Sequence, residues 1–128
     1  MTARSKARKE ALDRLFESDL RNTSVDLSNL GDLREYSREI LIGVGNNLTR
    51  IDELIRSYIQ GWDFDRIPSV DRNILRLAIW ELLWSQTPEA VVIDEALQLA
   101  SDLSTENSPN FIHGVLSKLA LLKGKIAL

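Results

Sequence analysis

The segment from Arg66 to Leu119 constrains the fold most, because it predicts three consecutive helices with clear boundaries. Apolar residues recur in it at spacings of three and four, which is the period of one helix face. The first helix, ending near Ser85, is apolar on almost every side and is therefore expected at the centre of a bundle. Hydroxyl and proline residues mark the three starts, at Pro68-Ser69, Thr87-Pro88-Glu89 and Ser108-Pro109.

The preceding half of the chain predicts further helices. Residues 4–20 and 32–60 carry apolar side chains at helical spacing, and the polar, turn-rich residues 21–31 are expected to link them. Gly43 and Gly45 weaken a helix interior, so we expect either a break near residues 45–48 or a close helix crossing there. Gly61 is suited to a C-terminal cap.

No strand-like alternation is found, and the predicted class is therefore all-α. We expect a single domain over residues 1–128 with about six or seven helices. It would consist of two small helical bundles packed together, an N-terminal one over about residues 1–60 and a C-terminal one over about residues 61–128.

The sequence offers no catalytic chemistry. It has no cysteine, His113 is its one histidine, and no HExxH, GxSxG or phosphate-binding glycine loop occurs. Adjacent acids such as Asp94 and Glu95 point about 100° apart on a helix and do not form a catalytic dyad. We therefore expect a protein that is not an enzyme, with no cofactor and no metal. The lack of cysteine, of a membrane-length apolar run and of a secretory signal favours a cytoplasmic location.

Charge is distributed unevenly along the chain, whose net charge is −3. Arg4, Lys6, Arg8 and Lys9 all precede the first acid, Glu10, and acids outnumber bases from there onward. Such a basic tip can neutralise a few phosphates, whereas the acidic remainder suits a basic protein partner. A solvated terminus without function is the alternative interpretation of the tip.

Aromatic residues allow two interpretations each. Phe16 follows the basic tip by two turns and is suited either to stacking on an RNA base or to the helix's own apolar face. Trp80 and Trp84 lie one turn apart, either in the core or at a protein interface. For the charges inside apolar segments we expect a structural ion pair, for example between Arg76 and Glu95.

The order of residues between Arg66 and Leu119 resembles that of the NusB family of bacterial transcription antitermination factors. The matching residues are Asp71-Arg72, Ile74-Leu75-Arg76, Ala78, Trp80-Glu81-Leu82-Leu83, Pro88, Val91-Val92, Asp94-Glu95-Ala96, Leu99-Ala100, Ser108, Phe111, Gly114-Val115-Leu116 and Lys118. The opening ARSKARKEALDRLF also matches, and the Gly-Trp pair before the central helix resembles the actinobacterial branch.

This resemblance implies an all-helical factor that binds boxA RNA in nascent transcripts together with NusE, a small-subunit ribosomal protein. The pair would serve the RNA polymerase antitermination complex in ribosomal RNA operons. RNA contacts are implied for Arg4, Lys6, Arg8, Phe16 and Phe111, and Lys9 belongs to the same tip. Contacts with the protein partner are implied for Asp65, Asp71 and Asn107, the last at a position where an acid is common.

The chain departs from the family pattern at several of these positions. Ser5 and Lys6 stand where arginines are common, and lysine lacks the planar fork of arginine. Phe16 replaces a commoner tyrosine, and His113 a commoner asparagine. Two other hypotheses stay open: a helical interaction module, for example a homodimer through Trp80 and Trp84, and the NusB-like domain of a ribosomal RNA methyltransferase.

Overall fold

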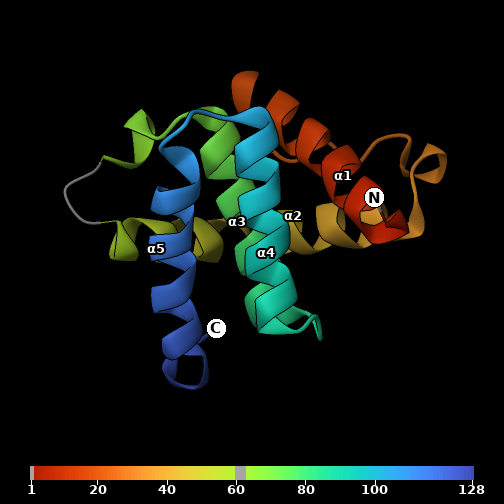
Figure 1. The fold of residues 1–128 in the computed structure, drawn as a ribbon. Coiled ribbons are helices and arrows are strands. Elements are labelled where there is room, and N and C mark those ends of the chain that lie inside the picture. Colours follow the sequence, from red (N-terminus) through yellow and green to blue (C-terminus); the bar gives the residue numbers. More distant parts are fainter. Residues whose placement is uncertain (1, 60–62) are drawn as a thin grey trace.

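The computed structural model describes residues 2–59 and 63–128 (Figure 1). They form five α-helices and three short 3-10 helices: α1 Ala3–Leu20, η1 Leu30–Asp32, α2 Glu35–Tyr58, η2 Phe64–Arg66, α3 Ser69–Trp84, α4 Glu89–Leu103, α5 Ser108–Leu121 and η3 Lys123–Lys125. The all-α prediction is confirmed. The expected six or seven helices are wrong for the described part, because residues 35–58 continue as one bent helix.

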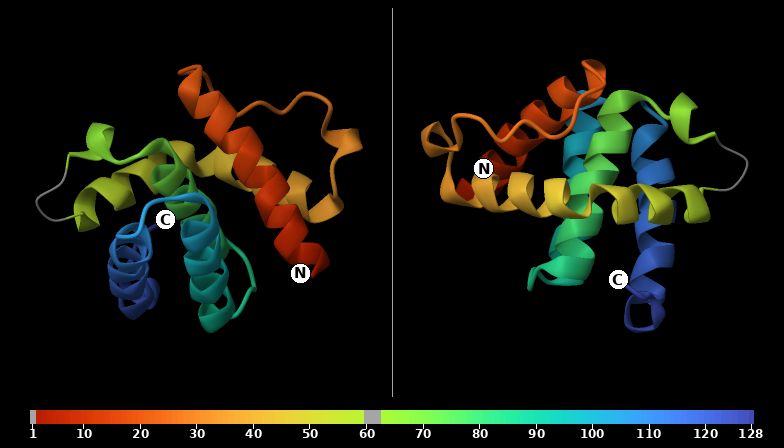
Figure 2. Two further views of the ribbon diagram at one scale, coloured as in Figure 1. Left: turned by 45° about the horizontal axis from the view of Figure 1, so that its top comes forward. Right: turned by 180° about the vertical axis from the view of Figure 1, so that it is seen from behind.

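Helix α3 is the centre of the molecule, as its apolar circumference predicts. It packs against α1, α2, α4 and α5, while α2 crosses behind α3 and α5 (Figures 1 and 2). One hydrophobic cluster draws buried side chains from all five helices. A division into two bundles near residue 60 stays a prediction, and that boundary, with the expected Gly61 cap, falls on residues 60–62, outside the described part.

Helix starts occur where the sequence predicts them, but not always through the predicted caps. Thr2 caps α1 by accepting from the Ser5 amide at 3.0 Å. Neither α4 nor α5 has a side-chain cap. The expected Thr87 cap is wrong, because the Thr87 hydroxyl turns inward to Ser85 and Glu81 instead. Proline, with its restricted backbone, is present at both starts, as Pro88 before α4 and Pro109 in the first turn of α5.

Helix α2 shows both of the alternatives that its glycines predict, a bend and a close crossing. Asn47 has non-helical angles (φ −121°, ψ 15°) and marks a bend, with its amide donating to the Gly43 carbonyl at 2.8 Å. At Gly43 the indole of Trp80 on α3 comes so close that a Cβ would lie 2.0 Å from its Nε1. Glycine is therefore required at the α2–α3 crossing.

A polar cluster ties α1 and α2 to α3. Asp19 accepts from Ser69 at 2.6 Å and from Arg72 at 2.7 Å, and Arg76 lies 2.9 Å from Asp52 and 3.3 Å from Asp19. The predicted Arg76–Glu95 pair is wrong in its partner, because the Arg76 side chain faces α1 and α2 rather than α4. The prediction rested on the rule that buried charges are paired, and Arg76 does follow this rule through Asp19 and Asp52.

Gly43→Ala should lower the free energy of unfolding by about 1–3 kcal/mol, since the added methyl group overlaps the Trp80 indole. Gly114→Ala in α5 is the matched control. Its Cβ would meet nothing within 4 Å, so the gain in helix propensity should stabilise the protein slightly. Urea unfolding of both variants checks this, and equal effects would contradict the close crossing.

Acid should destabilise the protein partly through Asp19. Burial raises the pKa of Asp19, but the Ser69 hydrogen bond and the Arg72 and Arg76 charges outweigh burial and leave the pKa lowered. The folded chain therefore holds this proton less tightly than the unfolded chain. Its contribution to stability is complete above about pH 4 and is lost as pH falls through the lowered pKa.

Asp19→Asn should accordingly reduce the free energy of unfolding at neutral pH by about 3 kcal/mol and flatten its decline below about pH 4. Asp32→Asn, which alters an exposed carboxyl in η1, should change neither. Urea unfolding across this pH range provides the measurement. An unchanged acid profile in Asp19→Asn would show that the cluster does not depend on this carboxylate.

Candidate RNA-binding surface

The four cations of the basic tip have different surroundings on α1. Arg4 and Lys6 are exposed and Lys9 is half-exposed, whereas Arg8 is buried. Lys9 pairs with the exposed Asp13 at 2.8 Å. Within residues 2–59 and 63–128, no carboxylate lies within ion-pair distance of Arg4 or Lys6. These two cations therefore keep their full charge toward solvent.

Arg8 is bound inside the protein. Its Nε and Nη2 donate to the two carboxylate oxygens of Glu81 at 2.8 and 3.0 Å, and its Nη1 lies 3.5 Å from Glu95. Burial lowers the pKa of Arg8, but the hydrogen bonds and charge of Glu81 outweigh burial and leave it raised. The RNA contact expected of Arg8 is untested. Because this guanidinium already has two carboxylate partners, we propose instead that Arg8 supports the tip of α1 from inside.

The aromatic residues expected at the RNA lie on α1 and α5. Phe16 is half-exposed, and among the described residues it is not one of the half-buried apolar side chains that pack on the core. The core interpretation is therefore not supported, and stacking of Phe16 on an RNA base stays a prediction. Phe111 packs against the core and lines a groove of about 220 Å³ with Arg66, Ile67, Pro68, Asp71, Thr105, Asn107 and Ser108.

Two of the three residues expected to face a protein partner, Asp71 and Asn107, line that groove, and Asp65 precedes its lining residue Arg66 in the chain. Asp65 and Asn107 are exposed. Asp71 is 3% exposed, and its carboxylate accepts from the hydroxyls of Ser104 and Ser108. Partner binding by Asp71 stays a prediction, and in the folded chain its carboxylate holds the start of α5 against α3.

The two tryptophans of α3 are half-buried and pack on the core. Trp80 lies over Gly43 and 6.4 Å from the ring of Tyr36. This packing explains at least Trp80 without a partner, so the homodimer hypothesis stays a prediction. His113 is exposed, and its Nε2 lies 3.4 Å from the Ser117 hydroxyl.

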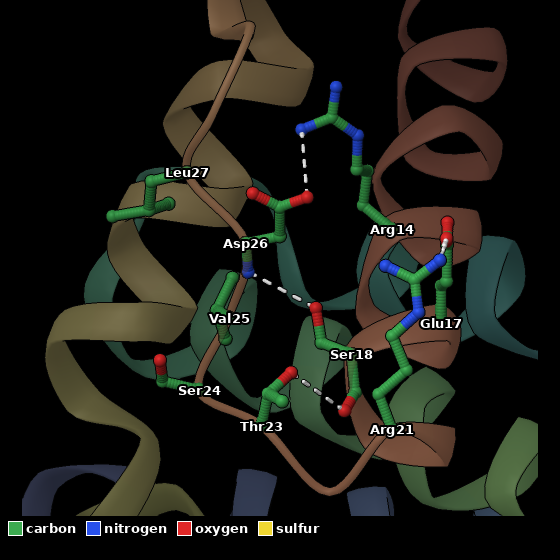
Figure 3. Close-up of a pocket in the computed structure, with 9 residues that line it drawn as sticks. All are labelled: Arg14, Glu17, Ser18, Arg21, Thr23, Ser24, Val25, Asp26 and Leu27. Atoms are coloured by element: carbon green, nitrogen blue, oxygen red, sulfur yellow. Dashed lines mark hydrogen bonds and ion pairs between the residues drawn. The ribbon is translucent and has the colours of Figure 1, made fainter.

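A second cavity, of about 370 Å³, lies between the end of α1 and the following loop (Figure 3). Its two arginines face acids of the same cavity. Arg21 pairs with Glu17 at 2.5 Å, and Arg14 lies 4.0 Å from Asp26 while donating to the Ser28 carbonyl. The cavity is thus neutralised by its own side chains and is a poor site for phosphate.

Within the described residues, no group of three or more acids or histidines is arranged to hold a metal ion. No described helix has the length and apolar character needed to cross a membrane.

The family model described as "NusB family" matches residues 5–121, nearly the whole chain. The chain belongs to the NusB family. Two similar proteins named "Transcription antitermination protein NusB" come from Nocardioides sp. and Streptomyces avermitilis. The first is 45% identical over 99% of this chain and 100% of its own length, and the second is 47% identical over 96% and 94%.

Solved structures of NusB proteins have the same fold. The Thermotoga structure named "T. maritima NusB" superimposes with a TM-score of 0.83 at 34% identity, over 94% of this chain and 92% of its own. The structure titled "Antitermination Factors NusB and NusE in complex with dsRNA" superimposes with a TM-score of 0.78 at 25% identity, over 92% and 96%. The resemblance found in the sequence is thereby confirmed.

Two residues that shape the tip carried weak signals in the sequence. Glu81 stands out only as an acid within an apolar helix, and Tyr36 only as one member of an apolar face. In the structure, Glu81 binds both Arg8 and Tyr36 and so joins α1, α2 and α3. Glu81 is 73 positions from Arg8 and 45 from Tyr36, and the sequence does not indicate contacts over such separations. Such long-range pairs require the folded structure.

Arg8→Ala should lower the free energy of unfolding by about 3 kcal/mol, because it leaves the Glu81 carboxylate buried without a counter-charge. Arg4→Ala, which removes the same kind of side chain one turn earlier, should cost about 1 kcal/mol or less. Urea unfolding without RNA tests the difference. Similar small costs would show that Arg8 is solvated like Arg4.

Proposed function

We propose that this protein is a transcription antitermination factor that binds boxA RNA together with the ribosomal protein NusE and promotes read-through by RNA polymerase. The observation that carries the proposal is the match to the NusB family over nearly the whole chain. Similar proteins are named as antitermination proteins, and one similar structure contains NusB with NusE and double-stranded RNA. The proposed role involves binding alone and no chemical step.

The RNA surface proposed here is the outer face of α1 with the start of α5. Arg4, Lys6 and Lys9 would hold phosphates, and Phe16 would stack on a base. Phe111 would contribute from the groove at the start of α5. Helices α1 and α5 are connected there through α3, since Asp19 holds Ser69 and Asp71 holds Ser108.

The protein partner is proposed to bind beside the same groove. Asp65 and Asn107 are exposed there, and the acidic chain complements a basic ribosomal protein. Asp71 would contribute indirectly by fixing the start of α5. A partner at this position would extend the RNA surface, which on this chain alone supplies only about three cations. Binding by the chain alone is therefore expected to be weak.

The proposal is tested by titrating fluorescent boxA RNA with this protein, with and without NusE. NusE should strengthen binding, and a scrambled RNA of the same length should bind more weakly than boxA. Equal affinity with and without NusE would contradict the cooperative mechanism. No binding of boxA in the presence of NusE would contradict the proposed function itself.

Replacing Arg4 and Lys6 together by alanine should weaken boxA binding and reduce the dependence of log K on log salt by about 0.7 for each lost phosphate contact. The control replaces Lys123 and Lys125 in η3. They are also exposed, but α4 lies between the end of α5, which η3 follows, and the start of α1 (Figures 1 and 2). The control changes net charge equally, so equal effects on affinity and slope would remove the α1 tip from the RNA site.

A further inference from the structure

The first turns of α1 are fixed on one side and exposed on the other. Ser5 and Arg8 lie three positions apart and therefore share a helix face. Ser5 donates to Glu95 on α4 at 2.7 Å, and Arg8 donates twice to Glu81 on α3. These contacts hold the tip of α1 rigidly against two core helices, while Arg4 extends from the solvent-facing side.

Tyr36 of α2 is fixed by the same carboxylate. Its hydroxyl donates to Glu81 Oε2 at 2.5 Å and lies 3.3 Å from the Thr87 hydroxyl. The pKa of Tyr36 is raised, first by burial and then by this hydrogen bond to Glu81, so the hydroxyl remains a donor. The ring also contacts Trp80. Tyr36 is thus anchored at its polar end and packed along one edge.

The Arg4 side chain packs on this anchored Tyr36 ring. The Arg4 guanidinium lies 4.2 Å from the Tyr36 ring centroid, within the range of a cation–π contact. An aromatic face restricts the arginine side chain without neutralising it, unlike a carboxylate. Arg4 therefore combines an ordered side chain with a charge that no carboxylate of the described residues neutralises. A preordered group loses less conformational entropy when it binds a ligand.

We infer that Tyr36 is a positioning residue for RNA binding, whose ring holds the Arg4 guanidinium in place for a phosphate. This inference rests on the proposed function. Tyr36 itself need not touch RNA. Glu81 belongs to the same device, since its carboxylate fixes both the Tyr36 hydroxyl and the Arg8 side chain below the tip.

The contact between the Tyr36 ring and Arg4 could instead hinder RNA binding, and that role predicts the opposite change in RNA affinity when the ring is removed. If the Tyr36 ring withheld Arg4 from RNA, removing the ring would release the guanidinium and strengthen binding. If the ring preorders Arg4, removing it weakens binding. Measurement of RNA affinity therefore separates the two roles directly.

The experiment compares four proteins with fluorescent boxA RNA in the presence of NusE: the wild type, Tyr36→Leu, Arg4→Ala and the double variant. Tyr36→Leu should weaken binding roughly two- to fivefold, the range of an exposed cation–π contact. Its salt dependence should stay that of the wild type, because the phosphate contact remains. The double variant should bind like Arg4→Ala, because the other guanidinium near the ring, that of Arg8 at 5.6 Å from the ring centroid, stays held by Glu81.

Tyr36→Phe is the conservative control. It keeps the ring but loses the hydroxyl bound to Glu81, so it should bind RNA within about twofold of the wild type even if it unfolds more easily. Wild-type affinity in Tyr36→Leu, stronger binding, or additive losses in the double variant would each overturn the inference. Lack of binding by the wild type would instead overturn the proposed function.

NMR of the wild type tests the same inference without relying on a folded variant. The side-chain δ protons of Arg4 should show an upfield ring-current shift from Tyr36, and the shift should persist when boxA RNA and NusE are added. Loss of the shift on RNA addition would show that Arg4 leaves the ring to bind, and would overturn the inference. The shift in the free protein is observable whether or not RNA binds.

Discussion

The carboxylate of Glu81 is the constraint on which the geometry of the basic tip depends. It is 1% exposed, and it receives hydrogen bonds from Arg8 on α1, Tyr36 on α2 and Thr87 in the loop before α4. A buried charge is tolerated only with such compensation. The same compensation fixes where α1 begins relative to the core, and hence where its exposed cations lie.

Helix geometry divides neighbouring cations between two roles. Arg8 faces the core and serves the fold, whereas Arg4 and Lys6 face solvent and are available to a ligand. The two acids expected at a protein partner are divided in the same way: Asp71 is buried and secures the start of α5, whereas Asp65 in η2 is exposed. In both places a buried ion or hydrogen bond supports the exposed residues beside it. The protein is thus a rigid scaffold that holds its proposed binding groups in position before RNA or a partner binds.

Much of the fold follows from local sequence. Proline and apolar periodicity locate α3, α4 and α5, and the glycines of α2 indicate a bend or a close crossing, both of which occur. These features depend on residues close in the chain, except that the crossing partner of Gly43, Trp80, is seen only in the structure. The partners of Arg76 and Arg8 do not, because they depend on which helix faces which. Arg76 meets Asp52 and Asp19 rather than the expected Glu95.

The candidate site was predictable to the same extent. The run of Arg4, Lys6, Arg8 and Lys9 is visible in the sequence as a block of charge, but its division into buried and exposed members requires the structure. The hydroxyls of Thr87 and Ser108 show the same limit. They mark helix starts correctly, yet their hydrogen bonds go to carboxylates on α3 rather than to the helix ends. Tertiary contacts outweigh local capping at both positions.

The central claim, that Arg8 supports the surface while Arg4 binds at it, is tested most directly by the guanidinium Nε–H signals of both arginines in one NMR titration with boxA RNA and NusE. The account predicts that the Arg4 signal shifts on RNA binding, while the Arg8 signal keeps its position and its slow exchange with water. An Arg8 signal that shifts or exchanges rapidly once RNA is bound, beside an unchanged Arg4 signal, would contradict it.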